Sequence, residues 1–182
     1  MNKIHVVIGM VAVVLLGSLA AASDHEHDGH EHRSRHGRRS SAADPNASPT
    51  HALYAQECGA CHLPFPPGLL PADSHRRIMA ALDRHFGQNA ELDPPVRDQI
   101  ERYLVDGAAE TGSFSKSHKV MASLDGTVPA RITDVPWFQR KHRRIDDRMV
   151  SREAIRSRSN CAACHPGADR WDFDDDAVRI PR

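Results

Sequence analysis

The sequence predicts a mainly α-helical fold made of two small domains. The string Cys-x-x-Cys-His occurs twice, at Cys58–His62 and Cys161–His165, once in each half of the mature chain. Apolar side chains recur at helical spacing in the segments that follow the first string. Only 5% of the residues are aromatic and the mean hydropathy is −0.54, so the folded part is short of apolar residues for two conventional cores. Each small domain therefore needs a further apolar element around which to pack.

Both strings have the spacing of a c-type haem attachment site. Cys58 with Cys61, and Cys161 with Cys164, would join the haem vinyl groups as thioethers. The adjoining His62 and His165 would each bind an iron from one face. The two strings use all four cysteines of the chain and predict two covalently bound haem c groups. The flat apolar surface of each haem would supply the apolar contact area that the residues of its domain lack.

The N-terminal segment predicts export. Lys3 precedes an apolar run over residues 6–22, which ends in Ala20-Ala21-Ala22 before the charged residues from Asp24 onward. This pattern is typical of a signal peptide, residues 1–22, with cleavage after Ala22 and a periplasmic mature protein. The alternative is an uncleaved anchor, but the run is a little short for a spanning helix of about 20 residues. We expect no stable membrane insertion after cleavage.

Residues 23–47 form a polar His/Arg-rich tail without apolar periodicity, which predicts disorder. Residues 25–32 alternate histidine with acidic residues, and residues 33–39 are basic. Imidazoles in such a tract can bind Zn²⁺, Cu²⁺ or Ni²⁺. The simpler interpretation is a solvated linker with incidental metal affinity.

Residues 48–110 are the expected first haem domain, with the layout of a class I cytochrome c. Ser48 and Pro49 begin a short helix into Cys58, and the prolines of residues 63–71 predict a stiff loop. Ser74 is expected to cap a helix that ends before Gly87, with Ile78, Leu82 and His85 on one face. A further helix begins at Asp93 and stops at Asp106-Gly107.

Residues 111–182 are the expected second haem domain. Their apolar residues are scattered rather than periodic, apart from a short helix expected over residues 146–157 that leads to Cys161. We therefore expect an irregular fold organised around its haem.

The charge balance gives no case for nucleic-acid binding. The chain has 24 basic and 24 acidic side chains, and loss of the signal peptide removes Lys3 and leaves 23 against 24. A basic segment, residues 140–148, and an acidic segment, residues 172–176, are exceptions to the even distribution. The basic segment either neutralises haem propionates or steers an acidic redox partner, or else the two segments only pair in solvent, which contributes little.

The second ligand of each iron decides the class of function. An iron with two protein ligands shuttles electrons, whereas an iron with an open position can bind small molecules and react. The candidates outside the two strings and the tail are His51, His75, His85, His118, His142, Met79, Met121 and Met149. His85 stands out on the apolar face of its helix, although it could be a simple C-terminal helix cation. His142 follows Trp137-Phe138, although it also sits in a run of basic residues.

Several motifs together make the chain resemble the dihaem cytochrome c family of bacterial periplasmic electron-transfer proteins. They are Glu57–His62, Pro67–Pro71, His85–Gly87, Arg131–Thr133, Lys141-His142 and Asn160–His165. The resemblance implies one haem per domain, each iron held by two histidines, with His85 and His142 as the second ligands. It also implies redox partners such as an oxygen-binding monohaem cytochrome c and a membrane cytochrome b. His75 departs from the family, which usually has tryptophan there.

These observations favour an electron-transfer protein that is not an enzyme. The alternative is a haem enzyme of the dihaem peroxidase or nitrogen-oxide reductase type, with one open iron and an acid/base group above it. A third hypothesis is a metal- or haem-handling protein that uses the His-rich tail.

Overall fold

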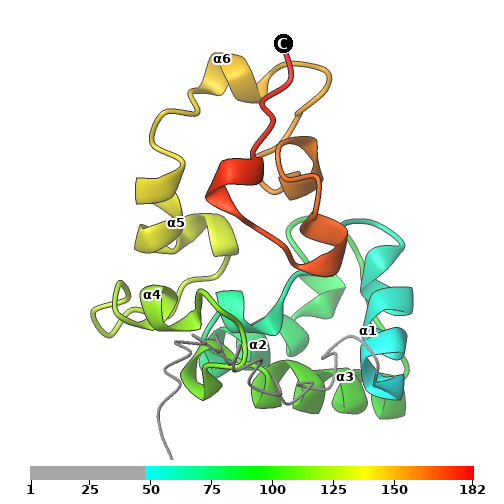
Figure 1. Ribbon diagram of the computed structural model, residues 1–182. Helices are drawn as coiled ribbons and strands as arrows, with labels where there is room; N and C mark the ends of the chain where they lie inside the picture. The colour runs from blue at the N-terminus through cyan, green and yellow to red at the C-terminus, as the bar shows by residue number, and fades with distance from the viewer. Residues whose placement is uncertain (1–47) are drawn as a thin grey trace, which may run out of the picture. The chain divides into compact units, whose positions relative to one another are not determined.

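The computed structural model of the chain describes residues 48–182, which belong to one compact unit (Figure 1). The predicted signal peptide, residues 1–22, and the predicted tail, residues 23–47, lie outside the described residues. The described part is mainly helical and has no strand, as predicted, and none of its helices is long and apolar enough to cross a membrane. The helices are α1 (Pro49–Gly59), α2 (Ala72–Met79), α3 (Pro94–Asp106), α4 (Ser117–Met121), α5 (Pro136–Lys141) and α6 (Asp147–Val150).

Helices α1 and α3 begin where the sequence places them. The Ser48 hydroxyl accepts a hydrogen bond from the backbone N–H of His51 at 3.0 Å, and Pro49 occupies the first turn, where a missing N–H costs nothing. Helix α3 starts after Asp93 with two prolines and ends at Asp106, before Gly107. Both helices pack in the first part of the chain, where α3 contacts α1 and α2.

The expected helix from Ser74 to the residue before Gly87 is wrong at both ends. Helix α2 begins at Ala72, whose N–H donates to both carboxylate oxygens of Glu110 at 3.0 Å. The Ser74 hydroxyl instead donates to the Pro129 carbonyl at 2.6 Å. The helix ends at Met79, because the chain turns there into a 3₁₀ turn at Leu82–Arg84 and a tight reversal at residues 85–88.

Residues 85–88 form a tight four-residue turn whose central residues are Phe86 and Gly87. His85 begins this turn and is not part of α2, which ends at Met79. Phe86 and Gly87 both have positive φ angles, 50° and 94°, and the Gln88 N–H donates to the His85 carbonyl at 3.0 Å. Two successive positive φ angles are the geometry of a type I′ turn, which a phenylalanine adopts only under strain. His85 is therefore held on a strained loop and not on a helix face.

The helix expected over residues 146–157 is much shorter in the structure, where only the single turn of α6 is helical. Asp146 caps it by accepting from the Met149 N–H at 2.8 Å. The chain then passes through turns that include Arg156 at a φ of 62°, which no continuous helix allows. The second Cys-x-x-Cys-His string follows these turns and begins with a 3₁₀ turn, Cys161–Ala163.

Two hydrophobic clusters form the core of the described residues. One lies between α1, α2 and α3 and contains Tyr54, Met79, Leu82, Ile100 and Leu104. The other joins the loop before α2 to α4 and α5 and contains Leu69, Leu70, Ala109, Val120, Leu124, Val135 and Phe138. The second cluster therefore takes side chains from both sides of residue 110.

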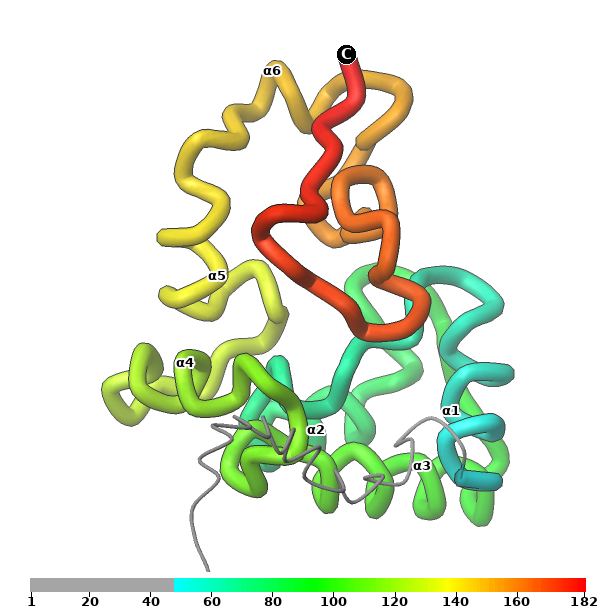
Figure 2. Tube along the Cα trace, in the orientation of Figure 1, coloured from blue at the N-terminus to red at the C-terminus, as the bar shows by residue number. Residues whose placement is uncertain are grey.

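The C-terminal segment returns to the first part of the chain. Figure 2 shows it running down from α6 past the Cys-x-x-Cys-His segment at residues 161–165 toward the loop after α1. There the Trp171 indole N–H donates to the Pro64 carbonyl at 2.9 Å. The segment then turns back, and its last residues lie beside α6 (Figures 1 and 2).

Candidate functional site

Each Cys-x-x-Cys-His histidine lies opposite a second histidine. The ring centres of His62 and His85 are 6.1 Å apart, and those of His142 and His165 are 6.2 Å apart. Two imidazoles bound to one metal ion through bonds of about 2.0 Å have ring centres roughly 6 Å apart. Both pairs thus have the spacing at which one iron fits between the rings.

Hydrogen bonds fix the tautomer of one ring in each pair. The Nδ1–H of His62 donates to the Leu63 carbonyl at 2.7 Å, and the Nδ1–H of His142 donates to the Phe138 carbonyl at 2.9 Å. An imidazole that donates through Nδ1 has its lone pair on Nε2, the nitrogen left to bind a metal. In His165, Nδ1 is buried and has no hydrogen-bond partner in the described part of the chain. No hydrogen bond of Nδ1 therefore fixes the tautomer of His165 within the described residues.

Burial favours the neutral, metal-binding form of one histidine in each pair. It lowers the pKa of His85 below the usual value, and the charge of nearby His62 lowers it further. It also lowers the pKa of His165, with a smaller contribution from His142. A neutral imidazole is the form that binds a metal ion.

None of the four cysteines forms a disulfide within the described residues, so all four are available for attachment to haem. Burial raises the pKa of Cys58 to about 11 and that of Cys161 to about 11. Because a thiol with such a pKa stays protonated at neutral pH, neither cysteine is an activated nucleophile. Their position beside the histidine pairs suits covalent attachment instead.

A cavity of about 300 Å³ lies between the second pair of histidines and the second pair of cysteines. Its walls are mostly apolar, with Phe138, Ile155 and Phe173 among them. Cationic side chains also reach it: Lys116, Lys141, Arg144 and Arg158. An apolar slot with two histidines, two cysteines and several cations fits a haem, whose ring is apolar and whose two propionates are anionic.

Each of the four histidines packs against a phenylalanine, a feature that the sequence interpretation missed. Phe65 and Phe138 stack on His62 and His142, with ring centres 5.1 Å and 3.9 Å apart. Phe86 and Phe173 meet His85 and His165 edge-on, at 4.8 Å and 5.4 Å. Four of the chain's five phenylalanines are used in this way. The spacing of Phe138 four residues before His142 is the one signal that could have been found in advance.

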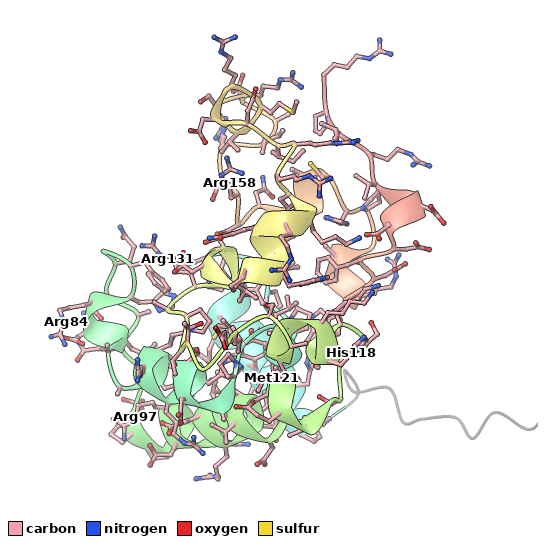
Figure 3. All side chains as sticks on the ribbon, turned by 90° about the vertical axis from the view of Figure 1, so that its left-hand side faces the viewer. Arg84, Arg97, His118, Met121, Arg131 and Arg158 are labelled. Carbon is pink, nitrogen blue, oxygen red and sulfur yellow. The ribbon has the colours of Figure 1, made fainter. Side chains whose placement is uncertain are left out.

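Arg131 connects the first pair to a distant segment. Its guanidinium lies 4.5 Å from the centre of the Phe86 ring, which is within the range of a cation–π contact. The contact bridges the turn that carries His85 and the loop before α5 (Figure 3). The Arg131–Thr133 motif thus acts on the first site, although it lies in the expected second domain.

The other candidate ligands lie away from the histidine pairs or are already engaged. Met79 is buried in the α1–α3 core, and the Nε2–H of His75 donates to the Pro67 carbonyl at 2.8 Å. The Nδ1 of His51 lies 2.8 Å from the Tyr103 hydroxyl. His118 is exposed on α4, with Met121 in the same helix (Figure 3). Met149 is half-buried on α6.

The comparisons with known proteins agree with this geometry. The sequence profile described as "Dihaem cytochrome c" matches residues 54–173. The chain belongs to the dihaem cytochrome c family. It therefore carries two covalently bound haem c groups. No curated protein matched the chain.

Solved structures of dihaem cytochromes c are similar to this chain along nearly their whole length. A diheme cytochrome c from Rhodobacter sphaeroides is 45% identical, with a TM-score of 0.59, and the match covers 67% of this chain and 95% of that protein. A diheme cytochrome type c from Shewanella baltica is 41% identical, with a TM-score of 0.61 and coverage of 74% and 95%. These identities place the chain among cytochromes of the electron-transfer type.

Proposed function

We propose that the mature protein is a periplasmic dihaem cytochrome c that transfers single electrons between redox proteins and that each iron has two histidine ligands. His62 and His85 would hold the first iron, and His165 and His142 the second. The observation that carries the proposal is the 6.1 Å and 6.2 Å spacing of two histidine pairs, each of which contains one Cys-x-x-Cys-His histidine.

When bound, each haem supplies an iron that gains or loses one electron. Cys58 with Cys61, and Cys161 with Cys164, would hold the two rings covalently. The Leu63 and Phe138 carbonyls orient the imidazoles of His62 and His142, and the stacked phenylalanines limit their rotation. Because the ligands are held in place in both oxidation states, little reorganisation would accompany electron transfer.

A haem enzyme with one open iron remains the alternative that has to be tested. It would need a site with one histidine on the iron and an acid/base group on the opposite face. In both pairs a second histidine lies opposite the Cys-x-x-Cys-His histidine, at a spacing that would let it fill that position, which supports the electron carrier over the enzyme. We therefore propose that the protein is not an enzyme.

Removal of the second histidine tests the ligand assignment. We expect His85→Ala to convert the first haem to a high-spin form that binds CO when reduced, and His142→Ala to do the same to the second. His118→Ala is the matched control, since His118 is exposed on α4. If His85→Ala leaves both irons low-spin and unreactive with CO, another side chain holds the first iron and the assignment is wrong.

The proposed location rests on the N-terminal segment, which precedes the described residues. Production with a c-type cytochrome maturation system should give a chain that begins near Ser23 and carries two haem masses. Mass spectrometry of the intact protein measures both features. A chain that retains residues 1–22 would contradict the cleaved signal peptide without affecting the haem assignment. The proposed partners are an oxygen-binding monohaem cytochrome c and a membrane cytochrome b.

A further inference from the structure

We propose that the surface around Ile180, at the edge of the second haem cavity, is a docking surface for an acidic one-electron redox protein. The Ile180 surface is defined as Ile180, its neighbour Arg179, Arg148 on α6, Arg152, which bonds to Pro181, and Arg144 and Arg158, which line the same cavity. The proposal rests on the electron-transfer function proposed above and adds a partner class and a place of contact.

The centre of this surface is an exposed apolar side chain beside the haem motif. Counting the polypeptide alone, Ile180 is 48% exposed, and it also lines the cavity, so one part of the side chain faces the second haem site. The backbone N–H of the preceding residue, Arg179, donates to the carbonyl of Cys164 at 2.8 Å. A protein that covers Ile180 would therefore lie close to the cysteine expected to carry the second haem.

Arginines surround this apolar centre. Helix α6 lies beside the C-terminal residues in Figures 1 and 2, and the Arg152 guanidinium donates to the Pro181 carbonyl at 2.7 Å. Arg144 and Arg158 line the same cavity as Ile180. An apolar centre with a polar rim is the usual arrangement of a protein–protein interface.

The charge of this region is positive and largely unbalanced. Residues 140–158 contain eight basic and three acidic side chains. Two of these acids pair with Arg156 and Arg158, whereas Arg144, Arg148 and Arg152 form no ion pair within the described residues. Within the described residues, the acidic segment forms one ion pair, between Asp175 and Lys141, and the charges of Lys116 and Lys119 also act on Asp175. Arg148, Arg152 and Arg179 form no ion pair within the described residues and are therefore available to a negatively charged partner.

The two parts of the described chain have opposite net charge. Residues 48–110 contain five basic and nine acidic side chains, a formal charge of −4, whereas residues 111–182 contain 14 basic and ten acidic, a formal charge of +4. Such a charge distribution orients an acidic protein toward the second part as the two approach. On contact, one electron would pass between the partner's redox centre and the second iron, so that one is oxidised and the other reduced, with no bond made and no proton moved.

A redox-inert paramagnetic anion tests where an acidic surface binds. We would add hexacyanochromate(III) to the reduced holoprotein and record the broadening of its NMR signals. Signals of residues 144–152 and 179–181 should broaden first, and those of α3, at the opposite end of the view in Figure 1, should remain sharp. Equal broadening along the whole chain would overturn the proposal.

Two charge-reversed variants separate this surface from general electrostatics. Arg148→Glu with Arg179→Glu changes two exposed arginines of the Ile180 surface. Arg77→Glu with Arg102→Glu makes the same change of charge at two exposed arginines of the first part. The first variant should lose the broadening around Ile180, and the second should keep it.

The rates of electron transfer with small reagents provide a second measurement. At low ionic strength, oxidation by ferricyanide should fall roughly tenfold in the Arg148/Arg179 variant and much less in the control variant. Oxidation by the cationic hexaammineruthenium(III) should rise in the same variant, which a simple change in driving force would not produce. If the oxidation rates with the two reagents both rise or both fall in the Arg148/Arg179 variant, docking at this surface is contradicted.

Three further outcomes show whether the docking proposal or the proposed function has failed. If the wild-type protein binds CO without any substitution, the bis-histidine electron carrier is wrong, whatever the anion mapping shows. If two reversible one-electron steps persist but the anion does not select the Ile180 surface, only the docking proposal fails. If anionic phospholipid vesicles bind this surface and hexacyanochromate(III) does not, the surface contacts a membrane and the proposal of a protein partner is overturned.

Discussion

The indole Nε1–H of Trp171 donates a hydrogen bond to the carbonyl oxygen of Pro64, 2.9 Å away, and so links two segments 107 residues apart. The neighbouring carbonyls are also engaged, because Leu63 accepts from His62 and Phe65 accepts from the Tyr54 hydroxyl. Three successive carbonyls of the loop after the first Cys-x-x-Cys-His string are thus fixed from three different places. The orientation of His62 depends on this loop, and therefore on the C-terminal segment.

Trp171→Phe should weaken this link and leave the aromatic packing largely intact. The loss of one hydrogen bond should lower the free energy of unfolding by about 1 kcal/mol. Denaturant unfolding of the holoprotein measures that change. We also expect a change in the absorption spectrum or potential of the first haem, because Pro64 follows His62 by two residues. An altered second haem with an unchanged first haem would show that the link does not act on His62.

His75 should make the stability of the protein sensitive to acid. Burial lowers the pKa of His75, and its Nε2–H is already donated to the Pro67 carbonyl. In the unfolded chain the ring takes up a proton near its ordinary pKa of about 6.5. Below that pH the unfolded state binds more protons than the folded state, so the free energy of unfolding falls as the pH decreases.

His75→Trp should remove this part of the acid sensitivity, because an indole N–H can donate to the Pro67 carbonyl without titrating. Denaturant unfolding of both holoproteins at pH 5 and pH 7.5 measures the difference. His118→Trp is the control for the introduction of an indole, since His118 is exposed. Identical pH dependence in the wild type and in His75→Trp would exclude His75 as its source.

Loss of the second haem should unfold only part of the expected second domain. With Cys161→Ala and Cys164→Ala, the cavity walls lose the group around which they pack, and residues 142–182 should become sensitive to protease. Val120, Leu124 and Val135 should stay protected, because they pack in one cluster with Leu69 and Leu70. Proteolysis followed by mass spectrometry locates the cleavage sites. Full resistance beyond residue 142 would show that this region folds without its haem.

The sequence is informative where local chemistry determines the structure. The Cys-x-x-Cys-His strings, the cap at Ser48 and the prolines that begin α3 each depend on neighbouring residues, so the pattern reveals them. The helix that was expected to continue to the residue before Gly87 fails for the opposite reason. Its first N–H group, that of Ala72, is satisfied by Glu110, and the Ser74 hydroxyl bonds to Pro129, partners that lie 38 and 55 residues away.

The environment of the candidate site is also determined by distant residues. His85 was selected for its position on an apolar helix face, yet the structure places it opposite His62 from a strained turn that Arg131 contacts. The phenylalanines beside His62 and His165 come from loops with no periodic pattern. The conformation of these loops, and not a helical spacing, brings Phe65 and Phe173 to the histidines, whereas tertiary packing brings Arg131 to Phe86.

EPR of the oxidised holoprotein is the direct test of two bis-histidine irons. We expect two low-spin ferric signals and no high-spin signal. The signals should also differ from each other, because the ring planes of His62 and His85 are 20° apart and those of His142 and His165 are 66° apart, and this angle sets the splitting of the iron d orbitals. A high-spin ferric signal that accounts for one of the two irons would contradict the account and favour an enzyme with an open haem.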